Sequence, residues 1–274
     1  MKIAYPRWLD LARSRSAQAL AWGTLALAAL PAHAALTFEE GIARDPASRA
    51  LLYREHHLVR RTDGKPTERL VTYRCADGTM FARKRVDYRA SALAPEFSFE
   101  DVRQGYREGL RRTGGTRTVW VNDARGEAER SAAVADPATA LVADAGFDEF
   151  IRKHWQPLMA GQSVALRFAV PSRLQTLGFK VDKVSSLKIG QEAAQSFRLK
   201  LGGLLGWVAP HIDVAYGRDS RRLMRFEGLS NLRSDDGRSQ LVVRIDFPAP
   251  AVAATEAQWR SAEGQPLSAC GVRP

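Results

Sequence analysis

The strongest constraint on the fold comes from residues 197–247, where apolar and polar side chains alternate along three separate runs. A period of two directs successive side chains to opposite faces of an extended chain, so each run predicts a strand with one buried face. The segments 217–220 and 235–237 are rich in glycine and aspartate, which is typical of turns. This stretch therefore predicts an antiparallel meander. The apolar members of the runs are Phe197, Leu199, Leu201, Ile212, Val214, Tyr216, Leu241, Val243, Ile245 and Phe247.

The N-terminal third continues the pattern. It predicts strands at residues 51–61, 67–76 and 80–89, and Asp77-Gly78 predicts a tight hairpin between the second and the third. In the first of these strands, alternation assigns five side chains to one face. They are Leu51, Tyr53, Glu55, His57 and Val59. Further strands are expected at 116–122, 128–134 and 163–170, and another is expected to begin at Leu177.

Two segments have helical rather than strand periodicity. Residues 97–112 predict a short helix or an irregular crossing, although two glycines weaken the helix. Residues 146–160 predict the one clear helix, with Asp144 as its cap and Pro157 as the residue that kinks or ends it. Its apolar stripe must pack on the concave face of the sheet. The stripe consists of Phe147, Phe150, Ile151, His154, Trp155 and Leu158.

Together these segments predict a mainly β fold. We expect a strongly curved antiparallel meander of roughly ten strands, an open or half barrel, wrapped around one apolar helix. Residues 35–248 are expected to form a single domain, because no internal repeat or low-complexity linker divides them. An alanine-rich tail at 249–274 follows, with a helical turn expected near Trp259.

Residues 1–34 resemble a secretory signal peptide. Four basic residues precede a short apolar run, and Ala32-His33-Ala34 forms a cleavage site of the A-x-A type. The alternative is a membrane anchor, but the apolar run is shorter than the ~20 residues that a membrane span needs. We therefore expect export, cleavage after Ala34 and a periplasmic location.

The expected export guides the interpretation of the net charge and of the two cysteines. The formal net charge is +11, and removing a leader with four basic residues and one acidic residue leaves +8. A basic exported protein is expected to contact anionic lipid, lipopolysaccharide or cell-wall polymers, and no nucleic acid. The alternative is that the arginines only form the solvated faces of strands. Export permits a disulfide between Cys75 and Cys270, with two free thiols as the alternative.

Catalytic motifs are weak in this sequence. The adjacent His56 and His57 lack the spacing of a helical zinc motif, residues 228–232 lack the second glycine of a nucleophile elbow, and no phosphate-binding glycine loop occurs. We therefore expect no metal and no cofactor. A hydrolase site formed by Glu55, His57 and His154 remains a minor hypothesis.

An apolar, glycine-rich loop at residues 202–210 joins two predicted strands. Loops normally run over the surface and are polar, so this one either packs into the core or contacts something apolar. With the helix and the concave face of the sheet, it could line a site for a lipid-like ligand. The residues expected to line that site are Phe147, Ile151, Trp155, Phe168, Phe179 and Trp207.

Three short motifs carry a resemblance to known proteins. They are residues 53–57, residues 71–75 with Asp77-Gly78, and residues 225–231. On these the chain resembles a family of uncharacterised exported proteins of bacterial envelopes, over most of its length, but such a family implies no activity. A curved β-meander over an apolar helix is also similar in architecture to the half-barrel carriers of lipoproteins and lipids, a likeness that implies nothing about individual residues.

The leading functional hypothesis is a non-enzymatic envelope protein that binds an apolar or amphipathic ligand. The alternative is a structural or interaction module that binds a membrane surface or another envelope protein through a sheet edge, a basic face or an apolar patch. A hydrolase is the least favoured of the three.

Overall fold

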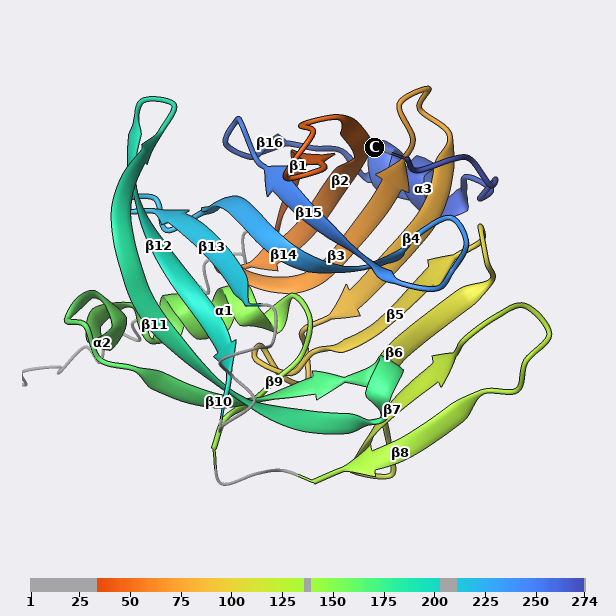
Figure 1. Ribbon diagram of the computed structural model, residues 1–274, viewed down its shortest axis with the longest axis horizontal. Coiled ribbons are helices and arrows are strands. Elements are labelled where there is room, and N and C mark those ends of the chain that lie inside the picture. Colours follow the sequence, from red (N-terminus) through yellow and green to blue (C-terminus); the bar gives the residue numbers. More distant parts are fainter. Residues whose placement is uncertain (1–33, 136–138, 203–210, 274) are drawn as a thin grey trace, which may run out of the picture. The chain divides into compact units, whose positions relative to one another are not determined.

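One large sheet accounts for most of the secondary structure (Figure 1). The structure is a computed structural model that describes residues 34–135, 139–202 and 211–273. Within these ranges the sheet has sixteen strands rather than about ten, partly because residues 34–44 and 97–112 add strands that alternation did not predict. The prediction of a mainly β protein built as an open antiparallel meander is confirmed. The leader expected at residues 1–34 lies outside the described residues except for Ala34.

The first eight strands form a meander in which each strand is antiparallel to the next. They are β1 (Ala34–Arg44), β2 (Leu51–Thr62), β3 (Lys65–Arg74), β4 (Met80–Asp87), β5 (Glu96–Asp101), β6 (Tyr106–Thr113), β7 (Thr116–Asn122) and β8 (Arg130–Val134).

The second half of the chain forms a second meander, with two short helices between its first strand and its second. A short parallel pair begins it, and the strands that follow are antiparallel. Its elements are β9 (Leu141–Val142), α1 (Gly146–Lys153), α2 (Trp155–Met159), β10 (Val164–Val170), η1 (Pro171–Arg173), β11 (Gln175–Ile189), β12 (Glu192–Leu201), β13 (Ile212–Gly217), β14 (Leu223–Arg233) and β15 (Gln240–Asp246). The tail adds β16 (Val252–Ala253), which pairs with β1, and α3 (Glu256–Gly264).

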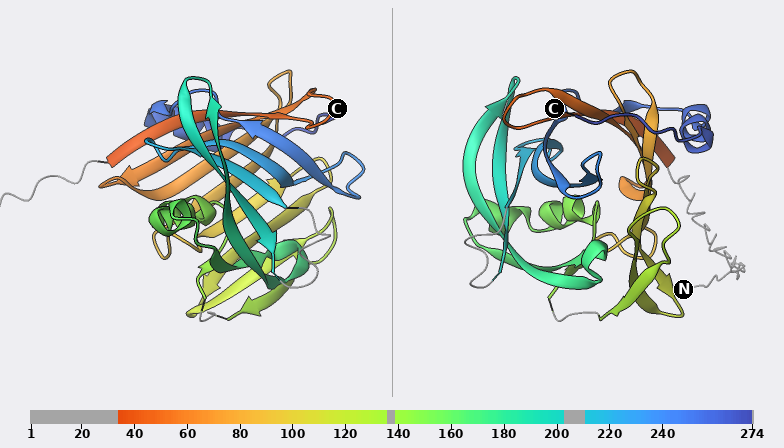
Figure 2. Two further views of the ribbon diagram at one scale, coloured as in Figure 1. Left: turned by 60° about the vertical axis from the view of Figure 1, so that its left-hand side comes forward. Right: turned by 45° about the vertical axis from the view of Figure 1, so that its right-hand side comes forward.

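β1 joins the two meanders, because it pairs with β2 on one edge and with β15 on the other. The ends of the sheet are β8 and β9, so the sheet does not close into a barrel. In Figures 1 and 2 it curls so that α1 lies on its concave side. Asp148 of α1 accepts hydrogen bonds from Arg69 of β3 at 3.2 Å and from Tyr216 of β13 at 2.8 Å. The helix is therefore fixed to both meanders.

The helix or irregular crossing predicted at residues 97–112 is wrong, since these residues form the hairpin of β5 and β6. Its two glycines explain the difference. Gly105 has a φ of +73°, a left-handed conformation that suits the turn between the strands. Gly109 packs so closely on β5 that an added Cβ would overlap the carbonyl oxygen of Phe97. Residues that weaken a helix here make a strand pair possible.

The helix predicted at residues 146–160 is interrupted. α1 ends at Lys153 and α2 begins at Trp155, with His154 between them at a φ of −102°. Pro157 accounts for the position of the break, because a proline ring clashes with the carbonyl group four residues earlier, here that of Lys153.

The outer face of β2 and β3 is partly covered by α3. Trp259 packs against Leu58 and Leu70, and the guanidinium carbon of Arg60 lies 4.0 Å from the centre of its ring. A capping box between Thr255 and the third residue of the helix fixes its start. These two strands are therefore buried on both faces, which strict alternation did not predict.

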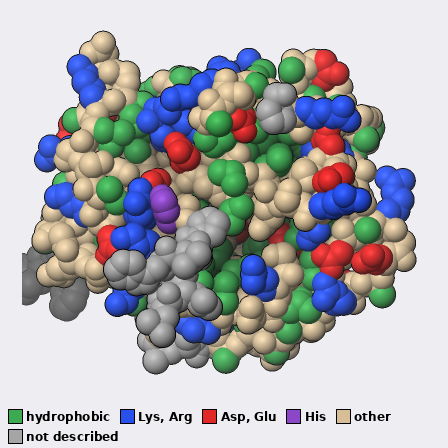
Figure 3. Space-filling view, in the orientation of Figure 1, with side chains coloured by type: hydrophobic (Ala, Val, Ile, Leu, Met, Phe, Trp, Pro, Cys, Tyr) green, Lys and Arg blue, Asp and Glu red, His purple; other side chains and the backbone are tan. Residues whose placement is uncertain are grey.

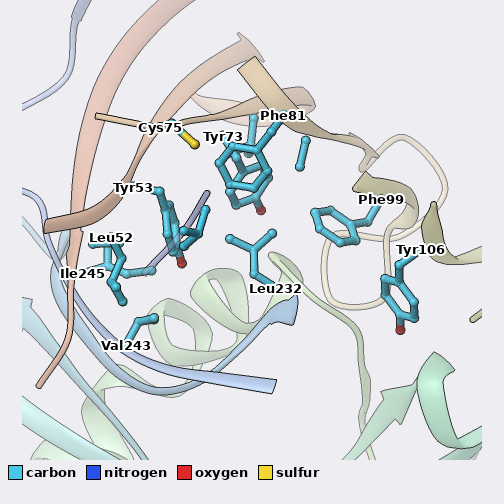
Figure 4. Close-up of a cluster of buried hydrophobic side chains, with 14 of the residues drawn as sticks. Leu52, Tyr53, Tyr73, Cys75, Phe81, Phe99, Tyr106, Leu232, Val243 and Ile245 are labelled. Atoms are coloured by element: carbon cyan, nitrogen blue, oxygen red, sulfur yellow. The ribbon is translucent and has the colours of Figure 1, made fainter. Parts of the chain in front are cut away.

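A disulfide joins Cys75, just after β3, to Cys270 in the tail, with the two Cα atoms 6.5 Å apart. It borders an apolar cluster in which five rings from β2 to β6 succeed one another (Figure 4). Neighbouring ring centroids are 5.5–6.4 Å apart, which is typical of tilted and edge-to-face packing. The five rings belong to Tyr53, Tyr73, Phe81, Phe99 and Tyr106.

Candidate functional site

Five of the six predicted lining residues come together in one apolar cluster between α1, α2 and strands β9 to β13. They are Phe147, Ile151, Trp155, Phe168 and Phe179. The sixth, Trp207, lies outside the described residues, together with the rest of the predicted loop from residue 203 to residue 210.

The cluster has an enclosed part and an accessible part. Ile151 and Trp155 are buried, and the ring of Trp155 packs edge-to-face on Phe197. Phe147, Phe168 and Phe179 stay partly exposed. Phe168 lies between the other two, with ring centroids 6.5 Å from Phe147 and 6.2 Å from Phe179. We call these three partly exposed rings the aromatic trio.

The outer surface offers little apolar area by comparison. Among the described residues, the exposed large hydrophobic side chains are three valines, Val184, Val242 and Val252, on three different strands. Hydrophobic side chains in the space-filling view gather around a hollow near the middle of the face, and lysines and arginines lie mainly around them (Figure 3).

A polar cleft of about 120 Å³ lies between α1 and the strands β1 to β3, and we call it the arginine cleft. Four arginines, two carboxylates and one histidine contribute to its wall, and apolar side chains complete it. Its lining residues are Thr37, Glu39, His57, Val59, Arg61, Arg69, Asp148, Arg152, Arg222, Leu223, Phe247 and Ala251.

Strand register explains how β1 to β3 bring these side chains together. Thr37 of β1 is paired with Val59 of β2, and Val59 is paired with Arg69 of β3. Paired residues project to the same face of a sheet, so Arg69 faces the concave side with them. Arg61 lies two residues after Val59 and shares that face.

Asp148 is the central carboxylate of the cleft. Burial alone would raise its pKa, but the charges of Arg69 and Arg152 and the hydroxyl of Tyr216 outweigh burial and hold the pKa below its ordinary value. Glu39 behaves differently, because burial raises its pKa more than His57 and Arg222 lower it. Asp148 is therefore firmly ionised at neutral pH, whereas Glu39 binds a proton more readily than a free glutamate does.

The arginines of the cleft are incompletely satisfied. The Nε atoms of Arg69 and Arg222 are buried and make no hydrogen bond within the described residues, although Glu192 lies 3.6 Å from that of Arg222. Arg61 donates to the carbonyl of Gly64 at 3.5 Å and forms no ion pair among the described residues. Burial lowers the pKa of Arg61, and the like charges of Arg152 and Arg69 lower it further. Within the lining, four arginines therefore face two carboxylates, and Arg61 has neither of them as an ion-pair partner.

The residues of the hydrolase hypothesis are only partly brought together. His57 lies 2.8 Å from a carboxylate oxygen of Glu55 and lines the arginine cleft. His154 does not belong to the lining of that cleft, and its ring forms a hydrogen bond with the carbonyl oxygen of Phe150 in α1. No group of three or more His, Cys, Asp or Glu suited to a metal ion occurs in the part of the chain that the structure describes.

Sequence reasoning missed a buried polar network inside the sheet. Lys84 of β4 donates to Asp144 at 2.6 Å and to Asn231 of β14 at 3.2 Å. Asn231 and Tyr106 in turn donate to the two carboxylate oxygens of Glu108 on β6. Asp144, predicted to cap α1, is engaged here instead, and α1 has no side-chain cap. The network links strands that are not neighbours in the sheet.

Comparison with known proteins gives a structural likeness alone. No protein-family model matches the chain, and no curated protein matches it in sequence. Among solved structures it is similar to a β-barrel-like protein of a domain of unknown function, DUF1849, from Brucella abortus. The two are 8% identical with a TM-score of 0.43, and the match covers 82% of this chain and 98% of that one. This neighbour, like the family that the sequence resembles, is a bacterial protein without an assigned function.

None of the described helices combines the length and the apolar character that a membrane span requires.

Proposed function

We propose that this protein binds an apolar or amphipathic, lipid-like ligand on the concave side of its sheet and has no catalytic role. The observation that carries the proposal is the aromatic trio, three neighbouring rings that remain partly exposed beside the buried cluster of α1 and α2. Pockets for small apolar ligands are concave and lined mainly by aromatic and aliphatic side chains.

The distribution of apolar side chains supports this proposal. The exposed large hydrophobic residues among the described residues are three separate valines, whereas the three partly exposed rings of the aromatic trio lie together. Export to the periplasm remains part of the proposal. The Cys75–Cys270 pair supports it, because disulfides persist in oxidising compartments.

A second candidate function is an interaction module of the cell envelope. The observation that favours it is β8, which pairs with β7 and forms one end of the sheet, with most of its residues exposed. An unpaired strand edge accepts an added strand from a partner. In this case the partner is a protein rather than a lipid.

Native mass spectrometry of the full chain, purified gently from its own envelope, tests the proposal. We expect an adduct of lipid mass and, after its removal, saturable binding of the fluorescent fatty acid cis-parinaric acid. A bare protein mass together with no fatty-acid binding contradicts the proposal and favours the interaction module.

The aromatic trio is tested by the double variant Phe168→Ala/Phe179→Ala. Each truncation removes apolar contact worth roughly 1 kcal/mol or more, so we expect cis-parinaric acid to bind at least ~10-fold more weakly. The matched control is Val184→Ala/Val242→Ala, which removes exposed side chains on the same sheet and is expected to leave affinity within about twofold. Equal affinity in both variants contradicts the assignment of the site.

A further inference from the structure

The arginine cleft is a second feature that points to a ligand, and its chemistry differs from that of the aromatic trio. We propose that the cleft binds a phosphate group, held by Arg61, Arg69, Arg152 and Arg222. The inference goes beyond the proposed function and does not rest on it, because the cleft lies against β1 to β3 and none of the aromatic trio belongs to its lining.

The arrangement of donors is the first argument. The buried Nε–H of Arg69 has no hydrogen-bond partner among the described residues, and that of Arg222 has only the carboxylate of Glu192 at 3.6 Å, beyond hydrogen-bond distance. A buried donor without a partner is unfavourable, and almost all such groups in proteins are satisfied by protein, water or a ligand. Arginine guanidinium groups match the oxygens of phosphate in pairs, so one such anion can accept several of these donors at once.

The carboxylates in and around the cleft are committed to three of its four arginines. Asp148 is committed to Arg69 and to the hydroxyl of Tyr216. Glu39 lies 3.3 Å from Arg222, but burial raises its pKa, so Glu39 loses its negative charge more readily than Asp148 does. Outside the lining, Glu149 pairs with Arg152 at 2.5 Å and Glu192 lies 3.6 Å from Arg222. Arg61 is left without a carboxylate partner among the described residues.

The size of the cleft narrows the ligand class. A volume of about 120 Å³ is several times the ~30 Å³ share of one water, but it is below the ~300 Å³ at which pockets for whole small molecules begin. The cleft therefore has room for a phosphate group. Leu223 and Phe247 form an apolar part of the wall and belong to the interior clusters of the sheet. Either free phosphate or the head group of a phospholipid supplies this chemistry.

Calorimetric titration of the full chain with inorganic phosphate, in phosphate-free buffer at fixed ionic strength, tests the inference. We expect saturable binding with a Kd in the millimolar range or below. Arg61→Gln is expected to weaken it about tenfold, because Arg61 makes no ion pair that the fold requires. Arg238→Gln is the matched control, since it removes the same charge from a side chain that is 87% exposed, and we expect a change below twofold.

Two outcomes overturn the inference: no phosphate binding by the wild-type chain up to about 10 mM, or equal weakening by the two variants, which reports net charge alone. If Arg61→Gln does not fold, Arg152→Gln takes its place, because that side chain is partly exposed and lies on the other wall of the cleft.

A second titration with a short-chain phosphatidic acid, below its micelle concentration, distinguishes the two sources of phosphate. A lipid head group in the cleft is supported if phosphatidic acid binds the wild-type chain more tightly than inorganic phosphate does. In Phe168→Ala/Phe179→Ala its affinity should then fall to that of inorganic phosphate. Equal affinity for both probes supports free phosphate. The failure of cis-parinaric acid to bind, with phosphate binding intact, contradicts the proposed function and leaves the arginine cleft in place.

Discussion

Glu108 shows how a charged side chain is held inside the sheet. Burial raises its pKa, while hydrogen bonds from Tyr106 and Asn231 and the charge of Lys84 lower it without cancelling the rise. A carboxyl group with a raised pKa binds its proton more tightly in the folded protein than in the unfolded chain. Its contribution to stability is therefore complete below the unfolded value of about 4.3 and is lost as pH rises through the folded value.

Replacing Glu108 by Gln should remove this pH dependence while keeping a side chain of similar shape. We expect the free energy of unfolding of the variant, relative to wild type, to increase between about pH 4 and the raised folded pKa, and then to stay constant. Urea denaturation at a series of pH values measures the difference. A difference that is flat across this range means that Glu108 keeps an ordinary pKa in the folded protein.

The residues of the arginine cleft and of the buried network that lie on strands occupy inward positions. Alternation correctly grouped His57 and Val59, and both line the arginine cleft. The same alternation places Arg61 and Arg69 on that face, and it places Lys84 among the inward positions of β4. A charged side chain at an inward position is a detectable signal. The partners of these side chains were not predictable, because Asp148 reaches Arg69 and Asn231 reaches Lys84 from elements distant in sequence.

Local elements were predictable where turn signals were strong. The segments Asp63-Gly64 and Asp77-Gly78 lie at turns, and both glycines have positive φ. The segment at residues 97–112 failed because four apolar side chains happened to follow helical spacing while Gly105 and Gly109 served a hairpin. For a short segment, helical and strand periodicity overlap, and tertiary packing decides between them.

α3 is the element whose attachment depends most on a single side chain. Trp259 is 7% exposed and packs on the outer face of β2 and β3. We expect Trp259→Ala to lower the free energy of unfolding by about 3 kcal/mol, at the lower end of the cost of removing a large buried ring. Hydrogen exchange should show α3 opening while β4 to β7 stay protected.

The control for this variant is Arg260→Ala, on the exposed face of the same helix, where a change within about 0.5 kcal/mol is expected. Similar losses in the two variants indicate that α3 contributes through its helical structure rather than through the contact of Trp259 with the sheet.

At the scale of the whole molecule, the disulfide closes most of the chain into one loop. Cys75 and Cys270 are 195 positions apart, and cross-linking so long a loop lowers the entropy of the unfolded chain by an amount worth up to about 5 kcal/mol. We expect the double variant Cys75→Ser/Cys270→Ser to lose about 3–5 kcal/mol in urea denaturation. Its slope against urea should steepen, because its unfolded state is more open.

Reduced wild-type protein serves as the control and should match the double variant. A loss below about 1 kcal/mol means that the tail is held mainly by other contacts, of which Val272 in the core and α3 on the sheet are the candidates.

The place of β1 in the middle of the sheet has a consequence for the order of assembly. β1 comes first in the described chain, yet Ile42 on one of its edges pairs with Asp246, about 200 positions later. Pairings over such distances form slowly, because the entropy cost of closing a long loop comes before the contacts that offset it. A growing chain therefore carries an open strand edge until its last strands have been made, and such an edge readily pairs with another unfinished copy. This architecture makes each new chain dependent on separation from its neighbours until synthesis is nearly complete.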